Sequence, residues 1–288
     1  MKHLWNFLLH HPLLEGRPFY AFTRFIFWQV RSRIFSKPMV FTWVGGSRLW
    51  LRRGWSGLTG NYYAGLNDFE EMSFLLHVLR PGDLFVDVGA NMGSYTILAS
   101  SVCRAHAIAY EPVDSTYLRL ESNIRLNQVE DLVMLRKCAA GERAATVLMT
   151  TGHDTTNHIV TNGVSTKPVD LVALDDDLPA VPILIKIDVE GFESAVLRGS
   201  KQILSEPKLK ALIIELNGAG RRYEEGDSQI HGCLLEYGFK PFRYSPFERR
   251  LTELASFGEN NTLYLRDTDF IAGRLREALP VMVLGRSI

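Results

Sequence analysis

The sequence predicts an α/β protein in which a mostly parallel sheet carries helices on both faces. Apolar runs of strand length alternate with helical segments from about residue 69 onward. Strands that are buried on both faces of a parallel sheet have this continuous apolar character. A glycine-rich turn follows the first strand, and acidic residues end three later strands. Sheets of this kind bind ligands at these strand ends.

The elements follow one another in a regular order. The expected helices are 69–79, which stops at Pro81-Gly82, then 94–102, 115–127, 192–204 and 228–237. The expected strands are 84–88, 106–111, 132–139, 182–188, 210–216, 239–245 and 261–266. Between residues 140 and 180, the β-like pieces ATVLMT and KPVDLVAL flank a polar loop. GWSGLTGNYYAGLND, which precedes the regular region, is expected to be a turn-rich connection.

The turn after the first strand points to a cationic ligand. It consists of Gly89, Ala90, Asn91, Met92 and Gly93. Such a turn also occurs in dinucleotide-binding proteins, but Asp87 beside it would repel a pyrophosphate. S-adenosylmethionine has an ammonium and a sulfonium group and no phosphate. The glycines would therefore let the backbone approach its methionine part, and Asp87 would balance its charge directly or through water.

Glu111 supports a nucleoside ligand. It ends the second expected strand, where an acidic side chain can accept both ribose hydroxyls. Enzymes that use NAD share this feature, so Glu111 alone does not distinguish the two cofactors. The alternatives are a turn-capping role for Asp87 and a solvated strand end for Glu111.

At these residues the sequence resembles the FkbM-type methyltransferases. The segments that carry the resemblance are DLFVDVGANMGSYTILAS, AYEPVDSTYLRLESNIRLNQ, LVALDDDL, LIKIDVEGFESAVLRGS and ALIIEL, between about Phe69 and Leu265. The resemblance implies a class I methyltransferase fold with seven strands, one of them antiparallel near the edge. It also implies S-adenosylmethionine as the cofactor and a hydroxyl of a sugar or secondary metabolite as the acceptor. By this similarity, Asp87, Gly89, Asn91, Gly93 and Glu111 are cofactor residues.

KIDVEGFE is the second acidic block. Asp188 ends the fourth strand, which lies next to the first strand in this fold class, so its carboxylate should face the reactive methyl group. We expect Asp188 to contact the methionine part of the cofactor or to orient the acceptor. Glu190 is a further catalytic candidate, whereas Glu193 is expected mainly to stabilise the helix N-terminus. Lys186 lies in a buried strand and needs a carboxylate partner.

Transfer to a hydroxyl also requires a group that removes its proton. His153 and His158, with Asp154 between them, lie in a polar loop that could cover the site, and His153 is a catalytic candidate. A surface role without chemistry is the alternative. The spacing of the two histidines on a loop does not indicate a metal pair, so no metal is expected. Glu215 and Asn217, which end the fifth strand, are further acceptor-side candidates, and the base stays open.

Two rival functions involve other parts of the chain. The cluster Asp175-Asp176-Asp177 resembles the metal-binding carboxylates of a glycosyltransferase, although Leu178-Pro179 after it favours an ordinary turn. A non-catalytic module docked on a membrane is the second rival. Its attachment would use several Lys or Arg residues near an anionic surface.

Residues 1–60 are expected to form a basic, aromatic extension of a methyltransferase domain at 61–288. They contain nine Lys or Arg residues and one Glu, a net charge of +8, while the whole chain is neutral. The global balance gives no sign of nucleic-acid binding. Phe22, Phe25, Ile26 and Val30 have helical spacing. We favour the interpretation that this stripe packs on the main domain as a lid. The alternative is an interfacial helix that lies on a membrane.

The expected location is the cytoplasm. No run is long and apolar enough to span a membrane, and no cleavage site follows the N-terminal apolar residues. The three cysteines are far apart without a CxxC pair, which fits a reduced compartment. The sequence therefore predicts a cytoplasmic O-methyltransferase, with a glycan acceptor at the inner membrane surface as a hypothesis and the oligomeric state open.

Overall fold

The structure is a computed structural model that describes residues 2–150, 158–160, 165–220, 226–258 and 260–288. Its central sheet consists of β3 (Leu84–Val88), β4 (His106–Tyr110), β5 (Val133–Arg136), β10 (Leu184–Ile187), β11 (Ala211–Glu215), β12 (Lys240–Ser245), β13 (Arg250–Glu253) and β14 (Asn261–Leu265). The strand order is β13-β12-β14-β11-β10-β3-β4-β5. The α/β class and the mostly parallel sheet predicted from the sequence are confirmed.

The pairing agrees with the expected topology and extends it. The five strands from β5 to β11 pair in parallel, and β14 runs antiparallel between β11 and β12. All seven expected strands are present. The eighth, β13, pairs antiparallel with β12 at the edge, and the sequence analysis missed it because its four residues are largely exposed and carry no apolar pattern.

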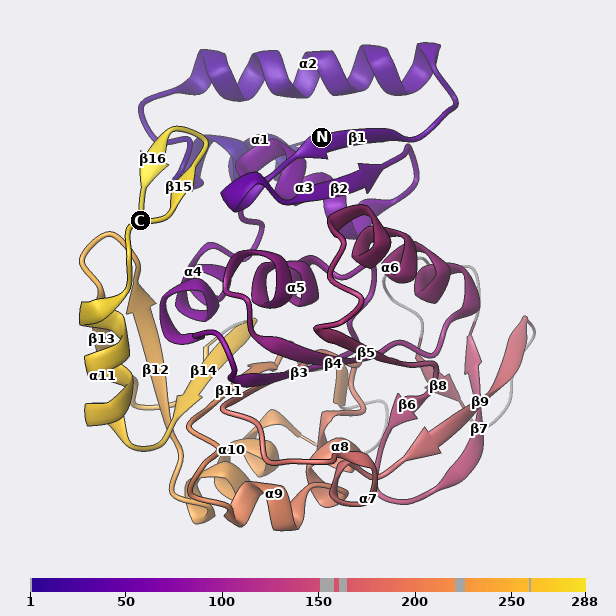
Figure 1. Ribbon diagram of the computed structural model, residues 1–288, viewed down its shortest axis with the longest axis vertical. Coiled ribbons are helices and arrows are strands. Elements are labelled where there is room, and N and C mark those ends of the chain that lie inside the picture. Colours follow the sequence, from indigo (N-terminus) through magenta and orange to yellow (C-terminus); the bar gives the residue numbers. More distant parts are fainter. Residues whose placement is uncertain (1, 151–157, 161–164, 221–225, 259) are drawn as a thin grey trace.

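Helices cover both faces of the sheet (Figure 1). One face carries α4 (Phe69–Val78), α5 (Ser94–Ile97) with the π-helical turn Leu98–Val102, and α6 (Asp114–Asn127). The other carries α8 (Glu193–Arg198), α9 (Lys201–Ser205) and α10 (Asp227–Glu236). Successive strand residues enter two separate cores: Phe85 packs into the first, whereas Val86 and Val88 pack into the second. This alternation explains why the central parallel strands are mostly apolar on both faces.

The expected helix 192–204 is divided into α8 and α9 at Gly199. A Cβ atom at Gly199 would lie 1.9 Å from the carbonyl oxygen of Gly141, so only glycine permits this approach of the two backbones. Gly141 follows β6 (Ala139–Ala140), which belongs to a separate four-stranded sheet with β7 (Ala145–Thr150), β8 (Ile159–Val160) and β9 (Thr166–Val172). The two β-like pieces predicted between 140 and 180 are therefore strands.

The N-terminal residues form an outer layer above α4, α5 and α6 (Figure 1). This layer contains α1 (Lys2–His10), α2 (Pro18–Ile34), β1 (Met39–Thr42), the 3₁₀ turn Val44–Gly46, β2 (Arg48–Leu51) and α3 (Ser56–Ala64). The backbone N–H of Trp50 in β2 donates to Asn123 Oδ1 in α6 at 2.9 Å. Buried residues of the layer, such as Leu13 and Leu49, belong to the same core as the sheet.

The predicted turn-rich connection before residue 69 is wrong, because α3 occupies residues 56–64. Leu58, Tyr62 and Tyr63 are buried in the core, and this burial stabilises a helix whose glycines give it low intrinsic propensity. The helix also crosses the boundary between residues 60 and 61 that the sequence analysis expected. The remaining elements are α7 (Leu174–Asp177), α11 (Thr268–Glu277) and the hairpin β15 (Met282–Val283) with β16 (Arg286–Ser287).

The aromatic stripe of α2 does not pack on the main domain as the sequence analysis favoured. Trp28 and Ala21 face inward, and Phe25 is partly buried. Phe22, Ile26 and Val30 are exposed. In the part of the chain that the structure describes, no helix combines the length and the apolar character needed to cross a bilayer.

Candidate active site

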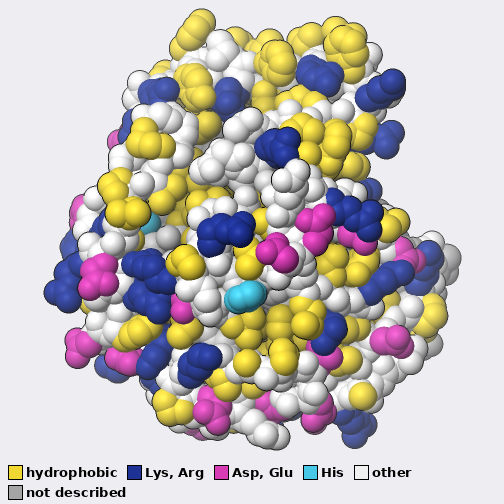
Figure 2. Space-filling model, viewed as in Figure 1, with side chains coloured by type: hydrophobic (Ala, Val, Ile, Leu, Met, Phe, Trp, Pro, Cys, Tyr) yellow, Lys and Arg dark blue, Asp and Glu magenta, His cyan; other side chains and the backbone are white. Residues whose placement is uncertain are grey.

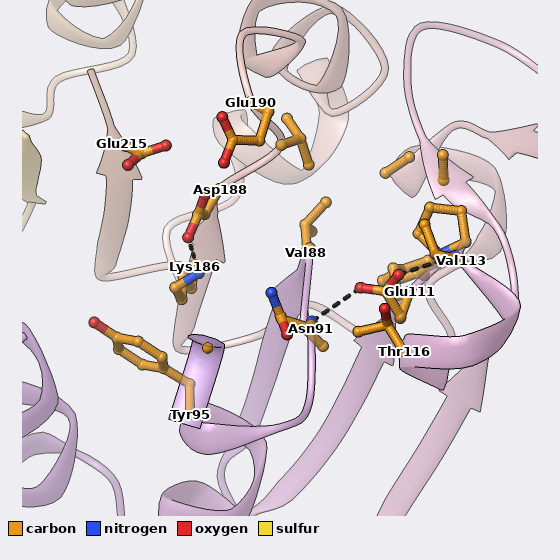
Figure 3. Close-up of a pocket in the computed structure, with 18 of the residues that line it drawn as sticks. Val88, Asn91, Tyr95, Glu111, Val113, Thr116, Lys186, Asp188, Glu190 and Glu215 are labelled. Carbon is orange, nitrogen blue, oxygen red and sulfur yellow. Dashed lines mark hydrogen bonds and ion pairs between the residues drawn. The ribbon is translucent and has the colours of Figure 1, made fainter. Parts of the chain in front are cut away.

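A cavity of about 350 Å³ lies at the carboxyl ends of β3, β4, β10 and β11. This volume is within the range of small-molecule sites. Figure 3 shows Lys186, Asp188, Glu190 and Glu215 on one side of the cavity, and Glu111, Val113 and Thr116 on the other. Val88 and Asn91, at the end of β3 and in the glycine turn, lie between these two groups. The cavity is therefore where the strand-end rule predicts a ligand.

The glycine turn brings the backbone of β3 against the turn after β10. Gly89 has φ +79°, and a Cβ there would lie 1.9 Å from the carbonyl oxygen of Asp188. The backbone N–H groups of Gly89 and Ala90 both donate to the carbonyl oxygen of Tyr110. Asn91 also has a positive φ, 52°. Gly89, Ala90 and Asn91 line the cavity, as predicted for the turn.

Gly93 and Asp87 lie near the cavity in sequence but do not form its wall. Neither is among the residues that line the cavity. Gly93 has φ +89° at the start of α5, and a Cβ there would lie 2.5 Å from Leu120 Cδ1. Asp87 is buried and accepts a hydrogen bond from the Thr96 hydroxyl at 2.6 Å. Its other oxygen has no hydrogen-bond partner among the described residues, so its predicted role in balancing cofactor charge stays a prediction.

Glu111 follows β4 directly and is held by two backbone groups. Its Oε2 accepts from the N–H of Asn91 at 3.0 Å, and its Oε1 accepts from the N–H of Val113 at 2.9 Å. Burial raises the pKa of Glu111 to about 8, although both hydrogen bonds favour the ionised form. The carboxylate lines the cavity and fixes the glycine turn in place. Each carboxylate oxygen can still accept from a further donor.

Beyond Glu111 the cavity becomes apolar. The side chains on this part of its wall are Val113, Ala139, Ala140, Met149 and Ile159. They come from the segment after β4 and from the four-stranded sheet. An apolar slot next to a carboxylate fits a flat base joined to a sugar, because the base is sequestered while the sugar hydroxyls find an acceptor.

Lys186 and Asp188 form a buried ion pair at the opposite end of the cavity. The Lys186 Nζ lies 2.9 Å from Asp188 Oδ2, and the Lys186 side chain is only 5% exposed. Burial opposes both charges, but their attraction outweighs it: the pKa of Lys186 is raised and that of Asp188 is lowered. Lys186 also lies over the Tyr95 ring, 4.9 Å from its centroid. The prediction that Lys186 needs a carboxylate partner is confirmed.

Glu190 and Glu215 lie beside Asp188. Asp188, Glu190 and Glu215 each have one carboxylate oxygen that lies within 4.8 Å of the corresponding oxygen of the other two. Burial and, to a smaller extent, the negative charge of Asp188 together raise the pKa of Glu215 to about 9. Glu215 is therefore neutral at pH 7 and can donate its proton toward Asp188, whose ionised form Lys186 stabilises. The expectation that no metal binds here stays a prediction.

Asp68 and Tyr95 are site residues that the sequence did not indicate. Both line the cavity, and the Tyr95 hydroxyl donates to Asp68 Oδ2 at 2.9 Å. Burial raises the pKa of Asp68, while the positive charge of Lys186 lowers it to a smaller extent. Asp68 was visible in the sequence only as an acidic residue before a helix. Nothing local indicated that α4 brings it to the end of β10.

Several predicted residues lie elsewhere. Glu193 Oε1 accepts from the N–H groups of Val189 at 3.1 Å and Gly191 at 3.0 Å, so it stabilises the turn before α8, as expected. Asn217 is exposed and does not line the cavity. His153 and Asp154 lie outside the described residues, and the role predicted for His153 stays a prediction. His158 is described, and it does not line the cavity.

The aspartate cluster serves the fold. Asp175 accepts from the N–H groups of Gln202 and Ile203, both at 3.0 Å. Asp177 accepts from the Tyr110 hydroxyl at 2.6 Å and pairs with Arg136 at 2.8 Å. None of the three aspartates lines the cavity. The interpretation of this cluster as the metal site of a glycosyltransferase is therefore wrong.

Comparisons with known proteins identify the family of the chain. Residues 87–241 match the family model described as the methyltransferase FkbM domain. The chain is similar to methyltransferase 1 of Beauveria bassiana (strain ARSEF 2860), with 28% identity over 41% of this chain and 59% of that protein. The chain thus spans less than two thirds of that relative.

Two solved structures are also similar. Methyltransferase FkbM from Methylobacillus flagellatus KT has 18% identity and a TM-score of 0.45, with 73% of this chain and 52% of that chain covered. A putative transferase from Pyrococcus horikoshii has 15% identity and a TM-score of 0.41, with 86% of each chain covered. Because the family model matches more than half of the sequence, the chain belongs to the FkbM methyltransferase family.

Proposed function

We propose that this protein transfers the methyl group of S-adenosylmethionine to a hydroxyl group of a saccharide, glycan or secondary metabolite. The observation that carries the proposal is a single cavity whose one end, at Glu111, suits a nucleoside and whose other end, at Asp188, is acidic. Between them the Gly89 backbone approaches so closely that no Cβ fits. This donor set matches a ligand that combines a nucleoside with positive charge.

The cofactor would extend across the cavity. Glu111 would accept the ribose hydroxyls, and the slot that contains Met149 and Ile159 would enclose the adenine. Asp188 would attract the positively charged methionine part. When bound, S-adenosylmethionine supplies a methyl group activated by its sulfonium.

The remaining part of the cavity would bind the acceptor. Its polar side chains include Asp68, Glu190, Glu215 and Asn261. Carboxyl groups form hydrogen bonds with sugar hydroxyls, and the ionised ones repel phosphate or carboxylate groups. Among the described residues that line the cavity, Lys186 is the one cation, and it is already paired with Asp188. We therefore propose an acceptor without negative charge near the reacting hydroxyl.

The protein would align the acceptor hydroxyl and remove its proton. The bond between oxygen and the methyl carbon forms as the bond between carbon and sulfur breaks, and the hydroxyl proton passes to a carboxylate. Asp188 is the first candidate because it is ionised and can accept a proton, although the lowered pKa that Lys186 causes makes it a weaker base. Glu190 is the second candidate, and His153 the third. Glu215, protonated at neutral pH, would stabilise the charge of Asp188 by donating to it.

The test is calorimetric binding of S-adenosylmethionine and S-adenosylhomocysteine, with NADH as the competing nucleotide. Glu111→Ala should weaken both cofactor forms at least about tenfold, because it removes the acceptor of both ribose hydroxyls and each such hydrogen bond contributes about 0.5–1.5 kcal/mol. Asp188→Asn should weaken S-adenosylmethionine more than S-adenosylhomocysteine, which lacks the sulfonium charge. Asp176→Asn, at an exposed position outside the cavity, is the matched control and should bind like the wild type. Binding of NADH alone would overturn the proposal.

A second measurement tests the acceptor. Methyl transfer from labelled S-adenosylmethionine should occur to neutral glycosides and be absent with the corresponding uronic acids. Glu190→Gln should lower the transfer rate without weakening cofactor binding, since Glu190 would serve the acceptor side. Transfer to acidic sugars in preference to neutral ones would contradict the charge argument.

A further inference from the structure

The outer face of α2 is a continuous apolar surface. Phe19, Phe22, Ile26, Phe27, Val30 and Ile34 lie on it at helical spacing. Their exposed fractions run from 41% for Ile26 to 78% for Phe19. Figure 2 shows hydrophobic side chains gathered along the edge of the molecule that α2 forms in Figure 1. A contiguous exposed apolar surface of this kind marks a binding face.

The inner face of the same helix already has its partners. The ring centroids of Trp28 and Tyr62 are 5.7 Å apart, and those of Phe25 and Tyr63 are 5.8 Å apart. Arg24 donates to the carbonyl oxygen of Tyr62. The helix is thus anchored to α3 by one side, and folding does not require the apolar residues of its other side.

Positive charge surrounds this surface. Arg33 and Lys37 are exposed at the C-terminal end of α2, and Figure 2 shows Lys and Arg side chains beside the apolar ones. Residues 1–60 contain one acidic residue, Glu15. An apolar helix face flanked by cations complements a bilayer with anionic headgroups, because the rings enter the interface while the cations attract the lipid charge.

The helix that supports α2 also reaches the cavity. Tyr62 and Tyr63 in the second half of α3 pack against α2, while Ser56 and Gly57 at its start line the cavity. A surface bound through α2 would therefore be connected to the rim of the site by one short helix, α3. This arrangement suits an acceptor that is itself held at a membrane.

We propose that the outer face of α2 docks peripherally on a bilayer that contains anionic lipid. The face formed by Phe19, Phe22, Ile26, Phe27, Val30 and Ile34 inserts at the level of the headgroups, and Arg33 and Lys37 contact the lipid charge. The helix lies along the membrane surface and does not cross it. The docking is independent of whether the chain transfers methyl groups.

Co-sedimentation of the full chain with vesicles tests the proposal. Wild type should bind vesicles of phosphatidylcholine with phosphatidylglycerol and bind pure phosphatidylcholine several-fold less. The double variant Phe27→Ser with Ile34→Ser should reduce binding at least about tenfold, because it removes two inserted side chains. The matched control is Leu279→Ser with Met282→Ser, two exposed apolar residues outside this face. It should bind like the wild type.

A charge variant supplies an independent readout. Arg33→Gln with Lys37→Gln changes only exposed side chains, so it should keep the fold and lose several-fold in binding to anionic vesicles. Added salt should weaken wild-type binding and have little effect on this variant. Equal binding by wild type and both α2 variants would overturn the proposal. A second result would also overturn it. This result is a stable wild-type dimer in sedimentation velocity that the Phe27→Ser, Ile34→Ser variant no longer forms, together with unchanged vesicle binding by that variant.

Discussion

Gly89 is the residue at which the glycine turn meets the end of β10. A Cβ atom added at Gly89 would lie only 1.9 Å from the carbonyl oxygen of Asp188, which is too close for any side chain. Gly89→Ala must therefore move the backbone of one of the two turns that form the site. We expect this variant to lose cofactor binding and to have a lower free energy of unfolding, measured by urea denaturation and calorimetry.

Gly82→Ala is the matched control for this prediction. Gly82 has φ +86°, close to the φ of Gly89, but apart from its chain neighbours no described residue has an atom within 4 Å of the position that a Cβ would take. Gly82→Ala should cost only the conformational strain of about 1–2 kcal/mol. Gly89→Ala should cost about 1–3 kcal/mol more, the usual penalty of overpacking. Equal effects of the two substitutions would show that the contact with Asp188 is unimportant.

The sequence could predict the site residues that belong to strand ends. Glu111, Asp188 and Glu215 follow or end parallel strands, and neighbouring parallel strands bring their carboxyl ends to one edge. The sequence could not predict Asp68, because it precedes α4 and reaches the cavity through the packing of that helix. It also could not show that Asp87 would point at Thr96, since the side-chain direction depends on the position of α5.

At the scale of elements, Glu193 holds the turn between β10 and α8. Its Oε1 accepts from two backbone N–H groups of the turn that carries Glu190. We expect Glu193→Ala to reduce the free energy of unfolding by about 1–2 kcal/mol, as for a lost helix cap. It should also reduce the rate of methyl transfer, because the turn that carries Glu190 would lose the two hydrogen bonds that hold it in place.

The conservative substitution separates positioning from chemistry. Glu193→Gln keeps an oxygen acceptor at the same position, so both stability and transfer rate should return close to those of the wild type. If Glu193→Gln were as inactive as Glu193→Ala, the carboxylate would have a role beyond its hydrogen bonds to the turn.

The elements that the sequence predicted well are those whose burial leaves a simple pattern. Strands β3, β10 and β11 are mostly apolar because helices cover both of their faces, and each contains a single charged residue near its carboxyl end. The sequence did not indicate α3, where packing against α2 overrides the low helix propensity of its glycines, or β13, an edge strand without an apolar face. Local patterns do not record such tertiary effects.

At the scale of the whole molecule, buried acids dominate the dependence of stability on pH. Burial raises the pKa of Glu193 to about 7, of Glu71 and Glu111 to about 8, and of Glu215 to about 9. In the unfolded chain, the pKa of a glutamate is about 4.3. Between these values the folded state holds protons that the unfolded state has released, so the free energy of unfolding falls as pH rises.

Two buried histidines act in the opposite direction below pH 6.5. Burial lowers the pKa of His11 and His77 to about 4, so the unfolded state binds more protons there and their contribution to stability rises with pH. Above pH 6.5 this contribution is complete, and only the loss from the buried acids remains. We expect the free energy of unfolding of the cofactor-free protein to fall by at least about 2 kcal/mol between pH 6.5 and 9, measured by urea denaturation. Glu215→Gln should make the fall shallower because it removes one titrating group, and a stability that rose over this range would contradict the assignment of these carboxyls as neutral at pH 6.5.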